Sequence, residues 1–254
     1  MMKLGFIGVG NMASAMISAL FGQKMCAFSK GKNSEFLSKN SVCILDSEKE
    51  VAKNADIVIL AVKPKDYNAI LDIIKDEMSG KILVSLAPNF SITQLQNTLK
   101  NAKIVRAMPN TPALVKSATT ALCFDKNFSD LDRQNVAGIF KSFGEVFEIK
   151  ESEFGAFVGI AGSLPAYAFM FIEALADAAV LNGLNRKMAY KIASNALLGS
   201  AKMALTSDKH VAMLKDEVCS PSGTTIEAVA SLEKNGFRSA VIEAVNACVA
   251  KCKS

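Results

Sequence analysis

The stretch that decides the fold is Lys3-Leu4-Gly5-Phe6-Ile7-Gly8-Val9-Gly10-Asn11-Met12-Ala13. A short apolar run of strand type leads into the pattern Gly-x-Gly-x-x-Ala, and a helical pattern follows. In the dinucleotide-binding fingerprint the first glycine makes the tight turn, the second lets the backbone approach a pyrophosphate, and the third position packs helix on strand. Amides at a helix N-terminus then hold the diphosphate. We therefore expect a dinucleotide site that includes Ile7, Gly8, Gly10, Asn11 and Met12.

Strand-type and helix-type segments alternate from this stretch to about residue 150. The pattern predicts strands at residues 3–7, 25–28, 42–44, 56–61, 81–86, 103–107, 118–124 and 145–149. It predicts helices at residues 11–21, 46–53, 64–77, 91–99 and 129–141. Apolar strands that alternate with helices indicate a parallel sheet covered on both faces. The expected class is α/β, with an N-terminal Rossmann domain whose doubly wound sheet is mostly parallel.

The pattern changes after residue 150, and almost everything that follows is of helical type. Helices are expected at residues 153–182, 186–205, 209–217, 222–234 and 236–252. Turn signals such as Asn182-Gly183 and Asn235-Gly236 separate some of these segments. We expect a dinucleotide-binding domain over residues 1–150 and an all-helical domain over residues 151–254. Its alanine-rich helices would pack closely and use a second copy of the chain to bury their faces.

The end of the second strand should decide which dinucleotide binds. NAD-binding proteins place an acid there, on the ribose hydroxyls. Here the chain reads Ser29-Lys30-Gly31-Lys32, and the next acid along the chain is Glu35. A hydroxyl and two ammonium groups suit a 2′-phosphate, so NADP(H) is expected over NAD(H). Lysine offers a point charge and not a fork, which leaves NAD(H) open as a second cofactor.

Three further strand ends should meet at the carboxyl edge of the sheet, where ligands of such sheets bind. They are Ala61-Val62-Lys63-Pro64, Ser85-Leu86-Ala87-Pro88 and Ala107-Met108-Pro109-Asn110-Thr111-Pro112. The last of these is a stiff loop with polar tips, and we interpret it as a wall of the nicotinamide pocket. The expected cofactor contacts from these strand ends are Ala61, Val62, Lys63, Pro64 and Ala87.

A fourth polar segment lies in the helical part. Cys219-Ser220-Pro221-Ser222-Gly223-Thr224-Thr225 precedes an apolar helix. Ordinary capping explains one hydroxyl at a helix start and leaves the others without a role. Hydroxyls and free amides at a helix start form a nest for a carboxylate or a phosphate.

Composition excludes several classes of protein. The chain has 254 residues, a formal charge of +5 and one histidine, His210, so a metal site built on several histidines is excluded and no metal is expected. The positive charge is too dilute for a nucleic-acid surface. Six cysteines without a CxxC pattern, and no signal peptide, indicate reduced thiols in a cytoplasmic protein.

One stretch could be mistaken for a membrane span. Residues 154–172 carry no charge, and this stretch is long enough to cross a bilayer. Internal glycines, Pro165 and the acids Glu173 and Asp177 argue against that, so no membrane partner is expected. We expect instead a helix buried on all sides, at a domain or subunit interface.

Taken together, these residues show that the whole chain resembles the pyrroline-5-carboxylate reductase family. The resemblance rests on the fingerprint, Ala61-Val62-Lys63-Pro64, Met108-Pro109-Asn110-Thr111-Pro112, Pro165-Ala166-Tyr167, Ala174-Leu175-Ala176-Asp177 and the segment from Ala196 to Met203. It also includes the Ser220 loop and Leu232-Glu233 followed by Gly236-Phe237-Arg238. Members of this family reduce 1-pyrroline-5-carboxylate to L-proline by hydride transfer from NAD(P)H to the C=N carbon.

The resemblance also implies an assembly and a substrate site. Family members have a helical domain that interlocks two subunits, and the dimers often assemble further, so a homodimer or a higher oligomer of dimers is expected. The small imino-acid substrate would be held through its carboxylate by the loop that contains Ser220, Gly223, Thr224 and Thr225. The hydroxyl of Thr225 would hydrogen-bond the ring nitrogen, which makes Thr225 the expected catalytic residue.

The chain departs from the family pattern at two positions near that site. Leu164 and Ser222 stand where the family has glycine. These two residues leave open two alternatives, a reductase of another cyclic imine and a non-catalytic NADP-binding protein. A β-hydroxyacid dehydrogenase is disfavoured, because residues 151–185 lack the lysine which that chemistry needs on the interdomain helix.

Overall fold

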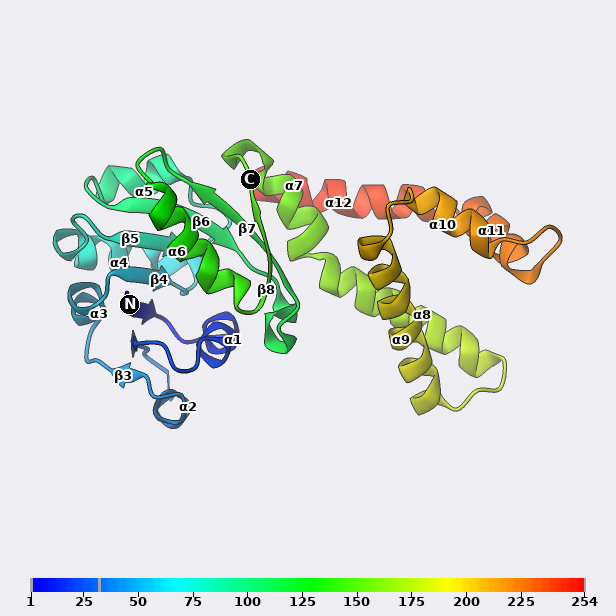
Figure 1. Ribbon diagram of the computed structural model, residues 1–254, viewed down its shortest axis with the longest axis horizontal. Coiled ribbons are helices and arrows are strands. Elements are labelled where there is room, and N and C mark those ends of the chain that lie inside the picture. The colour runs from blue at the N-terminus through cyan, green and yellow to red at the C-terminus, as the bar shows by residue number, and fades with distance from the viewer. Residues whose placement is uncertain (1, 32, 254) are drawn as a thin grey trace. The chain divides into compact units, whose positions relative to one another are not determined.

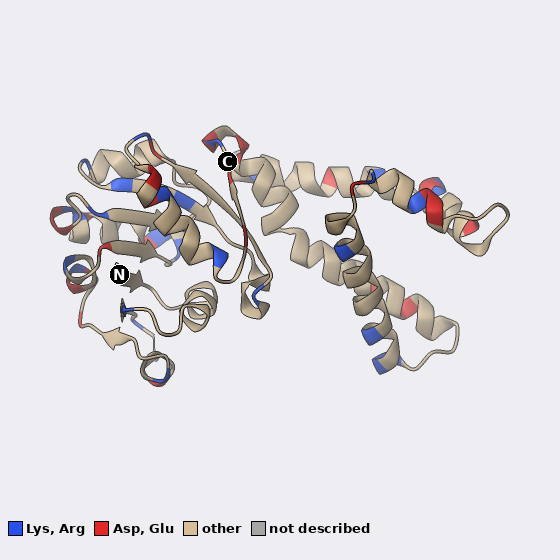
Figure 2. Cartoon of the chain, in the orientation of Figure 1, with Lys and Arg blue, Asp and Glu red and all other residues tan. Residues whose placement is uncertain are grey.

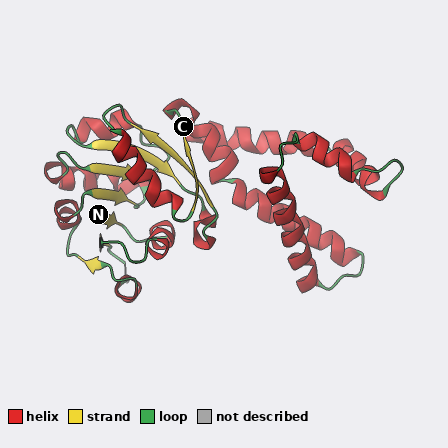
Figure 3. Cartoon of the chain, viewed as in Figure 1, coloured by secondary structure: helices red, strands yellow, loops and turns green. Residues whose placement is uncertain are grey.

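The computed structural model describes residues 2–31 and 33–253 (Figures 1 and 3). It divides the chain into two compact units. The first comprises Met1–Ser163 together with Cys248–Ser254, and the second comprises Leu164–Ala247.

The first unit is built on a mostly parallel sheet, as the strand pattern predicts. The strands follow the order β3-β2-β1-β4-β5-β6-β7-β8, and only the β6–β7 pair is antiparallel among the described strands. They are β1 (Leu4–Ile7), β2 (Met25–Phe28), β3 (Cys43–Ile44), β4 (Ile57–Leu60), β5 (Ile82–Ser85), β6 (Lys103–Met108), β7 (Ala118–Phe124) and β8 (Gly144–Glu148). A parallel return needs a crossover of a dozen or more residues, and the connection from Met108 to Ala118 is shorter than that.

Helices cover both faces of this sheet, as expected. They are α1 (Asn11–Ala19), α2 (Ser34–Lys39), α3 (Glu48–Asn54), α4 (Tyr67–Ile74), α5 (Ile92–Thr98) and α6 (Asp130–Lys141). The segment predicted as one helix over residues 64–77 is α4 flanked by two short 3₁₀ turns, η1 (Pro64–Asp66) and η2 (Lys75–Glu77). The sequence pattern did not predict α2, which has six residues and buries only Leu37.

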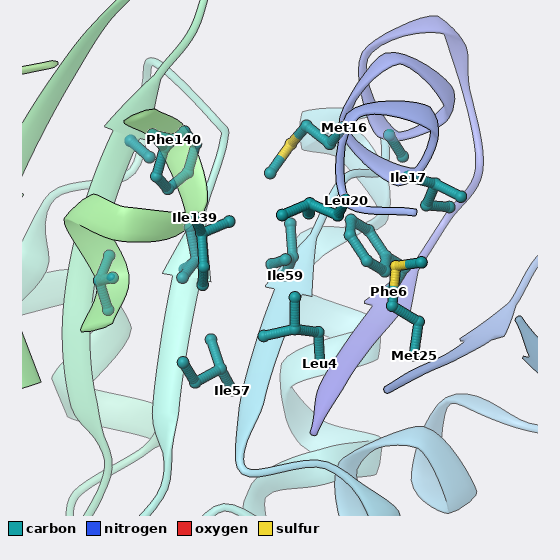
Figure 4. Packing of buried hydrophobic residues seen from close by; sticks show 14 of the residues in the cluster. Leu4, Phe6, Met16, Ile17, Leu20, Met25, Ile57, Ile59, Ile139 and Phe140 are labelled. Carbon is teal, nitrogen blue, oxygen red and sulfur yellow. The ribbon is translucent and has the colours of Figure 1, made fainter. Parts of the chain in front are cut away.

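Alternate strand residues serve two separate cores. Phe6 and Ile59 pack with Met16 of α1 and Phe140 of α6 on one face, in the cluster drawn in Figure 4. Their strand neighbours Ile7 and Leu60 point the other way and pack with residues of α3, α4 and α5. This is the period of two that a strand imposes, and it makes both faces of the parallel sheet apolar.

The second unit is helical, as predicted. Its helices are α8 (Leu164–Leu181), α9 (Arg186–Thr206), α10 (Val211–Val218), α11 (Thr224–Lys234) and most of α12 (Phe237–Lys253). The helix predicted over residues 153–182 is not continuous. A 3₁₀ turn, η4 (Glu151–Glu153), a four-residue helix, α7 (Phe154–Phe157), and a π-helical turn, η5 (Val158–Gly162), precede α8.

The apolar stretch, expected to be buried at a domain or subunit interface, is mostly exposed within the single chain, and its burial at a subunit interface stays a prediction. Residues from Glu151 to Leu181 form a helical segment long and apolar enough to cross a membrane by length and composition, and only 22% of its most apolar window is buried. Phe169, Met170 and Leu181 are exposed, and Figure 2 shows α8 mostly free of charge. An apolar surface of this kind marks an interaction site.

Candidate active site

The segments after β1, β2 and β4 meet at the carboxyl edge around one cavity of about 580 Å³, whereas the predicted strand ends after β5 and β6 do not line it. Strands β2, β1 and β4 are neighbours in the sheet and run parallel, so the loops that follow them converge there. Ten of the residues expected to bind a cofactor line this cavity, namely Ile7, Gly8, Gly10, Asn11, Met12, Ser29, Lys30, Ala61, Val62 and Lys63.

Two expected cofactor residues do not line the cavity. Pro64 begins the 3₁₀ turn η1 just beyond Lys63, in the first-turn position that proline favours. Ala87 follows β5 and is buried in the core shared with α4 and α5. Their assignment as cofactor contacts stays a prediction.

The two fingerprint glycines are required for different reasons. Gly8 has a φ of +89°, and a Cβ on it would lie 2.6 Å from Val62 Cγ1 and 2.7 Å from the carbonyl oxygen of Ala61. A Cβ on Gly10 would meet no atom within 4 Å. Gly8 is therefore needed for the turn itself, and the space beside Gly10 is open for a ligand.

The start of α1 has the chemistry of a diphosphate site. Gly10 is the N-cap of α1, and no side chain caps the first amides of this nine-residue helix. Orphan amides and the positive end of the helix dipole favour an anion there. The open side of Gly10 lets the backbone approach such an anion, so the residues present fit a bound dinucleotide.

The loop after β2 forms the other end of the cavity. Ser29 Oγ accepts hydrogen bonds from the backbone N–H of Gly31 at 3.3 Å and from Asn33 Nδ2 at 3.4 Å. Asn33 Nδ2 also donates to the carbonyl oxygen of Val9 at 2.7 Å, which ties this loop to the fingerprint. Lys30 lines the cavity, and Lys32, expected beside it, lies outside the described residues.

Sequence reasoning missed three polar residues of this cavity, Asn33, Glu48 and Asp66. Asn33 stands just before α2, a helix that the sequence pattern did not predict, so its position in the loop was not apparent. Glu48 is the first residue of α3 and comes from the segment after β3. Only the pairing of β3 with β2 brings Glu48 beside Lys30, and no local sequence pattern predicts that proximity.

A buried tyrosine links α4 to two strand ends beside the cavity. The Tyr67 hydroxyl donates to the carbonyl oxygen of Leu60 at 2.8 Å and lies 3.3 Å from Ser85 Oγ. Burial raises the pKa of Tyr67 to about 12, so this hydroxyl stays protonated throughout the physiological range. It acts as a neutral link between α4 and the ends of β4 and β5.

The loop after β6 is stiff, but Asn110 does not present its amide as a free polar tip. Asn110 is buried, its Nδ2 donates to the carbonyl oxygen of Ala161 at 3.0 Å, and its Oδ1 accepts the N–H of Thr119 at 2.9 Å. Pro165 has no N–H to donate four residues back to Ala161, and this leaves the Ala161 carbonyl open at the π-helical turn η5. Asn110 thus fixes the turn between α7 and α8.

We expect Asn110→Ala to lower the free energy of unfolding by on the order of 2–3 kcal/mol, because it leaves a buried carbonyl and an amide without their partner. Urea unfolding followed by circular dichroism measures this. Asn97→Ala on the exposed side of α5 is the matched control and should change stability by less than about 0.5 kcal/mol. Equal stabilities of the two variants would show that Asn110 is not needed to fix the turn.

The predicted substrate loop belongs to the second unit. Gly223 is the N-cap of α11, again without a side-chain cap, and Thr224 and Thr225 begin the helix. A Cβ on Gly223 would lie 2.3 Å from Ser220 Oγ and 3.1 Å from the carbonyl oxygen of Ser220. Ser222 has a φ of +56°, a conformation that suits glycine better than serine. The loop thus presents free helix amides beside the hydroxyls of Ser220 and Thr225.

The described residues contain no group of three or more His, Cys, Asp or Glu side chains that could hold a metal ion. His210 caps α10 through its Nδ1, which accepts the N–H of Ala212 at 3.2 Å, and it is exposed. Glu217, near the end of the same helix, pairs with Lys209 at 2.5 Å.

Comparisons with known proteins match both parts of the chain. Residues 151–254 match the family described as pyrroline-5-carboxylate reductase dimerisation, and residues 3–89 match the family described as NADP oxidoreductase, coenzyme F420-dependent. The chain is 44% identical to pyrroline-5-carboxylate reductase of Escherichia coli strain K12 over 98% of this chain and 96% of that protein.

Solved structures agree along the whole length. The crystal structure of Plasmodium falciparum pyrroline carboxylate reductase with NADP bound has a TM-score of 0.91 and 36% identity, covering 99% of this chain and 97% of that one. The Coxiella burnetii pyrroline-5-carboxylate reductase structure has a TM-score of 0.92 and 31% identity, with the same coverage. The chain matches an NADP oxidoreductase family and a dimerisation family, and its 44% identity to a pyrroline-5-carboxylate reductase extends over nearly its whole length. It therefore belongs to the pyrroline-5-carboxylate reductases.

Proposed function

We propose that this protein reduces 1-pyrroline-5-carboxylate to L-proline, with NADPH as the hydride donor. The observation that carries this proposal is the membership of the whole chain in the family, with a fingerprint cavity in the first unit and the dimerisation domain in the second. The cavity provides the dinucleotide site that such a reductase needs, and the dimerisation domain provides its oligomer contacts.

The reaction adds a hydride and a proton across a C=N bond. Bound NADPH supplies the hydride to the C=N carbon. The π electrons of that bond move to the nitrogen, which holds or gains a proton from water and becomes the secondary amine of proline. A cyclic imine is already electrophilic, above all when protonated, so the protein's main task is to align the reactants.

In this proposal the first unit holds the cofactor. The α1 amides and the open side of Gly10 receive the pyrophosphate, next to Asn11 and Met12. Ser29 and Lys30 face the adenosine ribose, and Ala61, Val62 and Lys63 form the wall toward the nicotinamide. Pro64 and Ala87 would complete that wall from the adjoining strand ends.

The second unit holds the substrate. Free amides at the start of α11, with Ser220, Gly223, Thr224 and Thr225, suit the carboxylate of the imino acid. The Thr225 hydroxyl can donate to a neutral imine nitrogen and accept from a protonated one. It serves as the contact that orients the ring nitrogen.

The wider biology is proposed on the same basis. The protein works as a homodimer through residues 151–254, or as a higher oligomer of dimers, with residues 1–150 as the cofactor domain. The exposed apolar surface of α8 is then covered by a second subunit and does not face a membrane. Its ligands are small molecules and not nucleic acids, and its compartment is the cytoplasm.

Oxidation of NADPH by the purified protein with 1-pyrroline-5-carboxylate tests the reaction directly. Rapid loss of the NADPH absorbance, with proline as the product, is the expected result. Faster turnover of a six-membered cyclic imino acid than of the five-membered one would favour the other imine reductase. NADPH binding with no turnover of either imine would favour a non-catalytic NADP-binding protein.

The close approach at Gly223 gives a prediction for the substrate loop. Gly223→Ala should raise the KM for pyrroline-5-carboxylate on the order of tenfold, because the new Cβ displaces Ser220 Oγ and presses on the Ser220 carbonyl. Steady-state kinetics at saturating NADPH measure it. Gly138→Ala in α6 is the matched control, since its new Cβ meets no atom within 4 Å, and it should leave the KM within about twofold. A normal KM for Gly223→Ala would show that Ser220 does not bind the substrate carboxylate.

A further inference from the structure

The ribose end of the cavity contains an acid that does not follow β2 in the sequence. Glu48 lines the cavity together with Ser29 and Lys30. The parallel pairing of β2 with β3, with Ala27 opposite Ile44, places the segment after β3 beside the loop after β2. The fold thus supplies, from a different strand, the kind of side chain that NAD-binding proteins place on the ribose hydroxyls.

Glu48 and Lys30 form a loose pair whose two side chains differ in exposure. Lys30 Nζ lies 3.7 Å from Glu48 Oε1, too far for a hydrogen bond. The Glu48 side chain is 10% exposed, whereas the Lys30 side chain is 83% exposed. The carboxylate is therefore held in place by its surroundings, and the ammonium group can swing away at little cost.

We infer that Glu48 determines cofactor specificity, and that the Glu48–Lys30 pair lets the enzyme accept both NADH and NADPH. This inference rests on the proposed function only in taking the cavity as the nicotinamide-dinucleotide site. The fixed carboxylate accepts hydrogen bonds from the ribose hydroxyls of NADH. The movable lysine turns from Glu48 to the 2′-phosphate when NADPH binds.

Charge opposes the phosphate at this position. A 2′-phosphate placed beside Glu48 brings like charges together in a partly enclosed cavity, where solvent screens them less than at the surface. Lys30 compensates only in part, because it is an exposed point charge. Asp66 also lines the cavity but is itself exposed, so its charge is better screened. Glu48 is thus the residue that limits the preference for NADPH.

Dissociation constants of NADPH and NADH, measured by fluorescence titration without the imine substrate, test this. Glu48→Gln keeps the shape of the side chain and removes its charge, so it should tighten NADPH binding about tenfold and weaken NADH binding about threefold. Lys30→Gln should weaken NADPH about tenfold and leave NADH within about twofold. Glu35→Gln removes an acid from α2 that does not line the cavity, and should change neither constant.

The ratio of the two constants decides the outcome. If Glu48→Gln changes NADH and NADPH binding by the same factor, Glu48 has a structural role only and the inference is overturned. If the unaltered protein binds neither nucleotide, both this inference and the cofactor site fall. If it binds both but does not turn over the imine, only the proposed reaction fails, and the shift in the ratio still decides the role of Glu48.

Discussion

Gly10→Ala should leave the protein as stable as the unaltered chain and remove most of its affinity for NADPH. A Cβ at this position meets no protein atom within 4 Å, so the fold loses nothing. The methyl group instead occupies the open space where the backbone must approach the pyrophosphate. Losing two charge-assisted hydrogen bonds from the α1 amides corresponds to a decrease in affinity on the order of 100-fold or more.

The neighbouring fingerprint glycine provides the matched comparison. Gly8→Ala places a side chain at a φ of +89° and within 2.7 Å of the carbonyl oxygen of Ala61. Strain of this kind costs on the order of 1–3 kcal/mol, so this variant should lose stability as well as affinity. Thermal unfolding without ligand, together with an NADPH titration, separates the two effects. If Gly10→Ala bound NADPH normally, the pyrophosphate could not lie at the start of α1.

Much of the fold of the first unit can be predicted from local sequence patterns. Apolar runs such as Ile57–Leu60 indicate strands buried on both faces, and the fingerprint predicts the turn between β1 and α1. The chain therefore predicts the fold class, most elements and ten of the cavity residues. The helical character of the second unit likewise follows from its composition and turn signals.

Other features depend on contacts between segments that are distant in the sequence. Glu48 reaches the ribose end only because β3 pairs with β2, and the residues between those strands do not encode the pairing. The turn before α8 is held by Asn110, which is 51 residues from the Ala161 carbonyl that it binds. The sequence predicts that α8 is apolar and needs a covering surface, but the sequence of one chain does not show which molecule covers it.

Removing the Thr225 hydroxyl should slow turnover without weakening NADPH binding. Thr225 is the second residue of α11, half-buried, beside the loop proposed to hold the substrate carboxylate. Its hydroxyl is the group proposed to orient the ring nitrogen while charge leaves the C=N bond. A lost donor of this kind typically costs on the order of 100-fold in kcat. Thr225→Val retains the shape and should be as slow as Thr225→Ala, whereas Thr225→Ser should keep most of the activity.

The comparison of these three variants separates chemistry from packing. If the serine variant were as slow as alanine, the methyl group and not the hydroxyl would matter; a fast valine variant would remove Thr225 from the reaction. Thr93→Ala, an exposed substitution on α5, controls for the loss of a threonine elsewhere and should leave kcat unchanged. A loss in kcat at an unchanged KM for pyrroline-5-carboxylate is the signature of a contact made in the transition state, because uniform binding of the imine would have changed that KM instead.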